Sequence, residues 1–172
     1  LIVYTEGSKT PKQEYSTYTA GGFEQGKLAI LINEGSASAS EIVAGVIQDM
    51  DRGLIIGQRS FGKGLVQTTK VVGYNSKVKM TTAKYYLPSG RCIQAIDYSG
   101  GYNDNLEKSS DSLRTSFKTT NGRTVYDAGG VDPDIDIDVE MYANITQSLV
   151  NKQLVFGYVN QYRLKHPTIP SP

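Results

Sequence analysis

The sequence has one cysteine, one histidine, no long apolar run and no excess of either charge. With Cys92 as its single cysteine, the 172-residue chain has no internal disulfide and no paired-cysteine zinc or redox motif, so a hydrophobic core must stabilise it. A chain of this length buries about 70% of its unfolded surface, which suffices for one domain. The 18 basic and 17 acidic residues argue against nucleic acid or anionic lipid as a partner. The best apolar stretch, Leu28–Ile32, is far shorter than the roughly 20 residues of a membrane-spanning helix.

Apolar periodicity predicts a mixed arrangement of strands and one central helix. Segments rich in Ile, Val, Leu, Thr and Tyr, each bounded by turn-forming residues, predict β-strands at 1–5, 27–33, 53–57, 65–73, 77–86 and 91–96. Between the second and third strands, apolar residues recur with helical spacing at Ile42, Val43, Val46, Ile47 and Met50. A strand, a helix over 38–51 and a strand in this order predict a parallel, right-handed crossover and an α/β fold.

The second half of the chain is less regular. Residues 97–128 are rich in Gly, Ser and Asn, and they predict an excursion of loops. Residues 134–140 alternate between acidic and apolar side chains, which predicts an edge or half-buried strand, and the pattern of 141–162 predicts helical structure.

A run of small hydroxyl residues, Asn33–Glu41, lies where an apolar strand turns into the predicted helix. A serine at a helix start suits a nucleophile, because the free N–H groups and the positive end of the helix dipole stabilise a developing oxyanion. The pattern from Ser38 to Glu41 is also an S-x-x-E capping box, which is the commoner role of such residues. Both interpretations stay open at this point.

A nucleophilic serine needs a base, and the sequence offers few. His166 lies in the terminal tail beside Pro167, so a Ser-His-Asp triad is not expected. A lysine acts as a base only where burial or nearby positive charge favours its neutral amine. Lys63 lies between two glycines, and no acidic residue occurs between Asp51 and Asp97. Lys63 therefore fits the apolar, glycine-rich pocket that a base needs, but most lysines are surface charges, and that interpretation stays open at this point.

Three rival motifs are weaker. Residues 57–64 nearly match the phosphate-binding G-x-x-x-x-G-K-[ST], but Gly64 replaces the hydroxyl residue and a strand-like segment follows. Residues 60–63 spell S-x-x-K without the S-D-N and K-T-G elements of penicillin-recognising enzymes. An alternating set of acidic residues would lie on one strand face without enclosing calcium: Asp132, Asp134, Asp136 and Asp138. No metal or cofactor is expected.

Several ordered motifs together resemble a known family. The segment N-E-G-S-A-S-A-S-E ending at Glu41, the helix, S-F-G-K-G around Lys63 and then Gln67 resemble the carboxyl-terminal processing proteases, also called tail-specific proteases. The segments Y-Y-L-P-S-G-R-C-I-Q at 85–94 and G-G-V-D-P-D at 129–134 are similar to further motifs of these Ser/Lys-dyad serine peptidases. The resemblance covers roughly residues 1–140.

The resemblance implies a role for four residues. Ser38 falls on the nucleophile, Lys63 on its base, Gln67 on the glutamine that orients this lysine, and the backbone N–H of Ala39 on one oxyanion donor. The implied activity is that of a serine endopeptidase that cleaves polypeptides near their C-termini through an acyl-enzyme. The implied substrates are unfolded chains or C-terminal tails, without a cofactor, in a periplasmic or otherwise extracytoplasmic bacterial location. Homo-oligomerisation is left open.

The resemblance also implies a domain organisation. It predicts a crotonase-like, ClpP-like sheet-and-helix core, with a partial catalytic domain at 1–140 that contains the loop-rich excursion 97–128, and a C-terminal helical segment at 141–172. The family's PDZ domain and its upstream segment with a second oxyanion donor have no counterpart in this sequence, so we expect this fragment alone to be weak or inactive. The alternative is a non-catalytic peptide-binding or scaffold module that keeps the fold and captures peptides without turnover.

Overall fold

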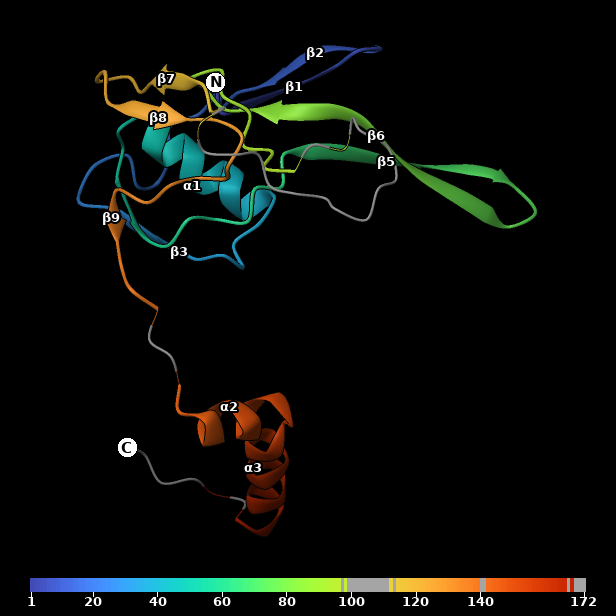
Figure 1. The fold of residues 1–172 in the computed structure, drawn as a ribbon, viewed down its shortest axis with the longest axis vertical. Coiled ribbons are helices and arrows are strands. Elements are labelled where there is room, and N and C mark those ends of the chain that lie inside the picture. The colour runs from blue at the N-terminus through green and yellow to red at the C-terminus, as the bar shows by residue number, and fades with distance from the viewer. Residues whose placement is uncertain (97, 99–111, 113, 140–141, 167, 169–172) are drawn as a thin grey trace. The chain divides into compact units, whose positions relative to one another are not determined.

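The computed structural model describes residues 1–96, 98, 112, 114–139, 142–166 and 168, and the chain divides into two compact units, 1–137 and 138–172. In the first unit the described elements are one helix and a set of short to medium strands (Figure 1). They are β1 (Val3–Gly7), β2 (Thr10–Tyr15), β3 (Ala29–Ile32), α1 (Ala39–Asp49), β4 (Leu54–Gly57), β5 (Leu65–Gly73), β6 (Ser76–Tyr86), β7 (Ser116–Lys118), β8 (Thr124–Tyr126) and β9 (Ile135–Asp136). The second unit contains α2 (Asn144–Asn151) and α3 (Leu154–Lys165).

A parallel sheet in the order β3-β4-β9 carries the candidate site at its carboxyl edge. Ala29 of β3 pairs with Leu54 of β4 in parallel register, and Ile56 of β4 pairs with Ile135 of β9. Because α1 connects β3 to β4, the predicted parallel β-α-β crossover is confirmed. The carboxyl ends of β3 and β4 therefore deliver two loops to the same edge of the sheet.

A second, antiparallel sheet has the order β2-β1-β6-β5. Its long β5–β6 hairpin reaches away from the rest of the unit (Figure 1). The hairpin turns at Tyr74 and Asn75, which both have positive φ. A two-residue turn that matches the twist of the flanking strands requires such values. Lys63 and Gln67 lie just before and within β5, so this sheet positions one side of the candidate site.

The hydrophobic core lies between α1 and the parallel sheet. It joins buried residues of β3, α1 and β4 to three loop residues: Ile32, Ala44, Val46, Ile55, Leu87, Ile93 and Val131. Alternate residues of a strand face opposite sides of the sheet, so Ile32 and Ile55 face the core while Leu31 and Leu54 face away and are 77% and 47% exposed.

The predicted helix over 38–51 is confirmed, as α1, but its buried face differs from the predicted one. Val46 is buried and Ile42 and Ile47 pack against the core, whereas Val43 and Met50 are 56% and 51% exposed, so the predicted apolar stripe is wrong at these two positions. Apart from Val46, the buried residues of α1 are small or polar and lie about one helical turn apart: Glu41, Ala44, Gly45, Gln48 and Asp49. Polar partners far away in the sequence make this burial favourable, as described below.

The strand predicted at 91–96 is not formed. Backbone groups of this segment form hydrogen bonds with loop residues. The Cys92 and Ile93 carbonyls accept from Ala128 N–H and Gly130 N–H, and Ala95 N–H donates to the Gly62 carbonyl. The prediction of loops for 97–128 missed the β7–β8 hairpin, and within this range residues 97, 99–111 and 113 lie outside the described part. The sequence reading also missed β2.

The predictions for 134–140 and 141–162 were only partly right. The described strand is the two-residue β9, and residues 140 and 141 lie outside the described part. The predicted helical segment consists of two helices, α2 and α3, and Gln153 between them adopts a left-handed conformation with φ 54°. No described residue of either helix is buried. Within the described part of the chain, none of the helices has the length and apolarity needed to cross a membrane.

Candidate active site

Ser38 lies at the junction between β3 and α1. Asn33 shapes the turn before it, since its carbonyl accepts from Ser36 N–H at 2.9 Å and its side-chain oxygen accepts from Gly35 N–H at 3.0 Å. Ser38 is the N-cap of α1 and has φ 59° and ψ −115°, a backbone conformation that residues other than glycine rarely adopt. Such a backbone costs on the order of 1–3 kcal/mol and persists only where the surrounding structure enforces it.

Ala39 is the first residue of α1. The first N–H groups of a helix have no acceptor within the helix, and they carry the positive end of its dipole. The Ala39 N–H, immediately after Ser38, is therefore a suitable donor for a developing oxyanion.

Lys63 lies on the loop that leaves β4. Two buried glycines flank it, and Gly62 has φ 89° and lies so close to Ala95 that a Cβ would stand 2.3 Å from the Ala95 Cβ. Lys63 itself is exposed, although the cavity that it lines is mostly apolar, as predicted. Its glycine neighbours pack the backbone against residues 94 and 95.

Lys63 and Gln67 line one cavity of about 450 Å³. The remaining walls are mostly apolar and amide side chains: Phe61, Leu65, Gln94, Ile96 and Tyr98, with Gly62 and Thr81. The Gln94 side chain holds this wall in place, because its oxygen accepts from Gly64 N–H at 2.7 Å and its nitrogen donates to the Ile96 carbonyl at 2.9 Å. Ser38 and Ala39 are not among the lining residues.

The carboxylate of Glu41 connects the Ser38 segment to the Lys63 segment. Its Oε2 accepts from the N–H of Ser38 and from the N–H of Lys63, both at 2.8 Å. Its Oε1 accepts from the Ser60 hydroxyl at 2.5 Å and from Gly62 N–H at 2.7 Å, and the side chain is fully buried. The capping-box pattern predicted the bond to Ser38, but the three bonds to the Lys63 loop had no signal in the sequence.

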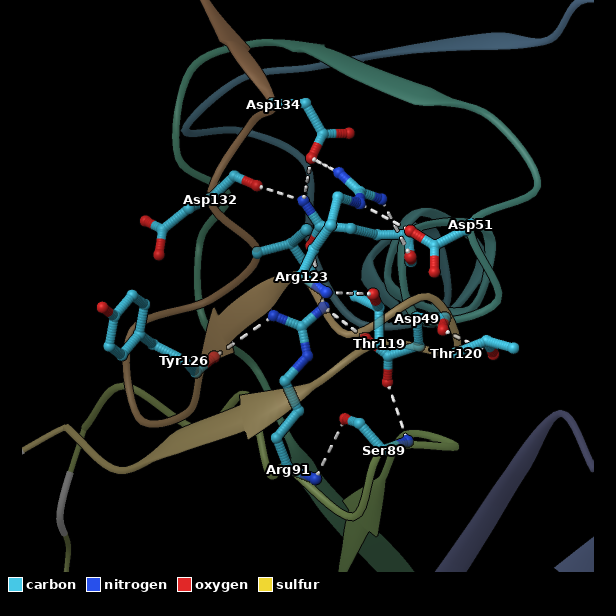
Figure 2. A network of polar contacts seen from close by, with 12 residues as sticks. Asp49, Asp51, Ser89, Arg91, Thr119, Thr120, Arg123, Tyr126, Asp132 and Asp134 are labelled. Carbon is cyan, nitrogen blue, oxygen red and sulfur yellow. Dashed lines mark hydrogen bonds and ion pairs between the residues drawn. The ribbon is translucent and has the colours of Figure 1, made fainter.

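The other end of α1 is held by a second polar network, shown in Figure 2. Arg91 is fully buried, with its Nη2 2.8 Å from Asp49 Oδ1 and 2.8 Å from Gln48 Oε1. Burial lowers the pKa of Arg91, against the opposing effect of Asp49. The same carboxylate accepts from Ser89 N–H at 3.0 Å, so the network ties α1 to the turn after β6.

The acidic residues of the segment before β9 are engaged by arginines. Asp132 binds Arg59 and Arg114, and Asp134 binds Arg123 and accepts from Ile55 N–H at 2.8 Å. Among the described residues, no group of three or more His, Cys, Asp or Glu side chains is arranged to hold a metal ion. These aspartates therefore connect loops to the parallel sheet.

The fold and the candidate site define a mixed α/β protein in which a helix-start serine and a lysine loop meet at one edge of a parallel sheet. Residues 1–101 match the sequence model of peptidase family S41, and the chain belongs to this family. The family resemblance drawn from the sequence motifs is thereby confirmed.

Individual relatives agree with this membership. The chain is 59% identical over 69 residues to a carboxy-terminal-processing protease of Bartonella bacilliformis, covering 40% of this chain and 16% of the relative. It is 39% identical over 95 residues to a carboxyl-terminal-processing protease of Synechocystis, covering 55% of this chain and 22% of the relative. The chain thus spans less than a quarter of the length of either relative.

The fold is also similar to a solved structure, that of a photosystem II D1 C-terminal processing protease. The TM-score is 0.55 at 30% identity, and the match covers 83% of this chain and 28% of the other.

Proposed function

We propose that the protein is a serine endopeptidase in which Ser38 is the nucleophile, Lys63 its base and Gln67 the residue that orients Lys63. The observation that carries the proposal is that, in a chain of peptidase family S41, one carboxylate oxygen binds the backbone N–H groups of both Ser38 and Lys63. The two backbone nitrogens therefore cannot lie farther apart than the sum of these two distances. A lysine side chain is long enough to span such a separation and reach the serine hydroxyl.

The proposed chemistry is acyl transfer. Lys63 Nζ takes the proton from Ser38 Oγ as this oxygen attacks the scissile carbonyl, and the Ala39 N–H stabilises the oxyanion. The protonated lysine then gives its proton to the leaving amine, which departs and leaves an ester on Ser38. Lys63 next takes a proton from water as the water oxygen attacks the ester, and it returns this proton to Ser38 Oγ as the carbon–oxygen bond of the ester breaks and the acid product leaves. Substrate that fills the cavity beside Lys63 and Gln67 excludes bulk water from the reacting atoms.

The substrate class and setting are part of the proposal. The relatives are named for processing carboxyl termini, so we propose polypeptide substrates cleaved near their C-termini, presented as unfolded segments or tails. We propose a crotonase-like core in residues 1–140 with a C-terminal helical segment at 141–172, and an extracytoplasmic location. The proposed location follows from the family resemblance, and one relative is named as chloroplastic.

The test is cleavage of an unfolded protein substrate by the full-length natural protein that carries this sequence. Ser38→Ala and Lys63→Ala should each lower kcat by roughly a thousandfold or more, because each removes one member of a unit that acts together. The matched control is Lys70→Ala, which removes an exposed lysine of β5 and should leave kcat within about twofold of wild type. The 172-residue chain alone should cleave roughly a hundred- to a thousandfold more slowly if a second oxyanion donor is supplied elsewhere.

Two outcomes would contradict the proposal. Cleavage that survives Ser38→Ala would remove Ser38 as the nucleophile. Tight peptide capture by the wild-type protein without any product would favour the alternative, a peptide-binding or scaffold module.

A further inference from the structure

Glu41 makes more contacts than a helix cap needs. A capping glutamate accepts one N–H from its own helix end, whereas Glu41 also binds three donors that lie 19 to 22 residues farther along the chain. All of these partners are donors, since Ser60 Oγ itself accepts from Val131 N–H at 2.7 Å and so has its proton available for Glu41. Four donors fill the acceptor capacity of an ionised carboxylate.

The two oxygens of Glu41 have different tasks. Oε1 holds the framework, through Ser60 and Gly62, while Oε2 binds the N–H of Ser38 and the N–H of Lys63. The bond to Ser38 acts on the residue with the unfavourable backbone of φ 59° and ψ −115°. Glu41 therefore supplies part of the surrounding structure that enforces this conformation.

We infer that Glu41 is a positioning residue, whose carboxylate fixes the distance and orientation between Ser38 and Lys63. The inference rests on the proposed function, because it assigns Glu41 a task for that pair of residues. Glu41 touches neither substrate nor the reacting atoms in this role. It acts through the backbones of the nucleophile and of the base.

The test uses Glu41→Gln, which keeps the size of the side chain and exchanges one acceptor oxygen for an NH₂ donor. If the NH₂ takes the place of Oε2, the bonds from Ser38 N–H and Lys63 N–H are both lost. If it takes the place of Oε1, the Ser60 hydroxyl can turn to accept from it, but the Gly62 N–H, next to Lys63, loses its acceptor. Because a displacement of about 1 Å in an active site can cost about a hundredfold, kcat should fall roughly a hundredfold per folded molecule. KM should stay within about threefold, because the side chain does not touch substrate. The assay uses the full-length natural protein.

The matched control is Asp134→Asn, the same carboxylate-to-amide exchange at the other edge of the sheet. Asp134 also accepts several donors, from Ile55 N–H, Gln48 and Arg123, and its side chain is 12% exposed. The Asp134→Asn variant should have a lower unfolding temperature and a kcat per folded molecule within about threefold of wild type. A merely structural role for Glu41 predicts the same behaviour for both variants.

The outcomes separate this inference from the proposed function. If wild type cleaves and Ser38→Ala does not, but Glu41→Gln keeps kcat within about threefold of wild type, the positioning role is wrong and the protease assignment stands. If wild type does not cleave, or Ser38→Ala cleaves equally well, the proposed function is wrong, and the inference about Glu41 is then wrong as well.

Amide hydrogen exchange in the wild-type protein covers the case in which Glu41→Gln does not fold. The amides of Ser38, Gly62 and Lys63 should exchange at a common rate, roughly a hundredfold or more slower than unprotected amides, because one buried carboxylate holds all of them. Fast exchange at Ser38 or Lys63 would overturn the inference.

Discussion

At the scale of single residues, the candidate site depends on backbone conformations that are unfavourable by themselves. Ser38 has a positive φ without being a glycine, and Gly62 combines a φ of 89° with close contact to Ala95. The backbone N–H of each of these two residues donates a hydrogen bond to the Glu41 carboxylate. The geometry of the site is thus stabilised by long-range hydrogen bonds against local strain.

Gly62→Ala tests this view of the Lys63 loop. An alanine at positive φ costs on the order of 1–2 kcal/mol, and here its Cβ would also stand 2.3 Å from the Ala95 Cβ. We expect a loss of roughly 3 kcal/mol or more in the free energy of unfolding, measured in urea. The control is Gly73→Ala, where φ is 101° but no atom lies within 4 Å, so that only the conformational cost of about 1–2 kcal/mol applies. Equal losses would mean that the loop moves away from Ala95 at no cost.

At the scale of elements, α1 combines a correct prediction with a wrong one. The periodicity of apolar residues identified the helix and its position between two parallel strands. It misassigned Val43 and Met50, because hydrophobicity alone cannot show that Glu41, Gln48 and Asp49 have buried partners. Apart from Ser38, these partners lie 19 or more residues away, so their contribution is absent from any local pattern. Long-range partners also explain the wrong strand prediction at 91–96, because the backbone of this segment forms hydrogen bonds with distant loop residues that no local pattern shows.

The buried pair of Asp49 and Arg91 gives an element-scale prediction. Removing one member leaves the other charge buried without its counter-ion, so Arg91→Met should cost about 3–5 kcal/mol in the free energy of unfolding. The double variant Asp49→Leu with Arg91→Met removes both charges and should be more stable than Arg91→Met alone. It should recover only part of the loss, because Ser89 N–H and the Tyr126 carbonyl then lose their partners. A urea-unfolding double-mutant cycle measures this coupling, and additive effects of the two changes would show that the pair does not interact.

At the scale of the whole first unit, carboxylates connect segments that lie far apart in the sequence. Arg123, from the turn before β8, binds Asp51, two residues after α1, and Asp134, just before β9 (Figure 2). Asp51 also accepts from Asn121 N–H at 2.6 Å. The sequence motifs identified the family and the candidate residues Ser38, Lys63, Gln67 and Ala39, but not these connections. Pairings between distant segments depend on the completed fold, which periodicity does not describe.

These connections predict how stability depends on pH. Burial acts to raise the pKa of Asp51, but the hydrogen bonds from Asn121 N–H and Arg123 outweigh it and hold this pKa below its ordinary value. The unfolded chain, where an aspartate has a pKa of about 3.9, therefore binds this proton more readily than the folded chain. The stability that Asp51 contributes is present above about pH 4 and is lost as the pH falls through the lower, folded-state pKa.

Asp51→Asn should therefore be less stable than wild type at pH 7, and the difference between their unfolding temperatures should shrink between about pH 5 and pH 2. Thermal unfolding at pH 7, 5, 4, 3 and 2 measures this difference. Arg123→Met is the companion variant, since it removes the guanidinium that lowers the pKa and should also converge with wild type in acid. Asp51→Asn and wild-type curves that stay parallel down to pH 2 would show that Asp51 ionises equally in the folded and unfolded chains. The link between α1 and the turn before β8 would then stabilise the fold by packing and neutral hydrogen bonds, independently of the charge on Asp51.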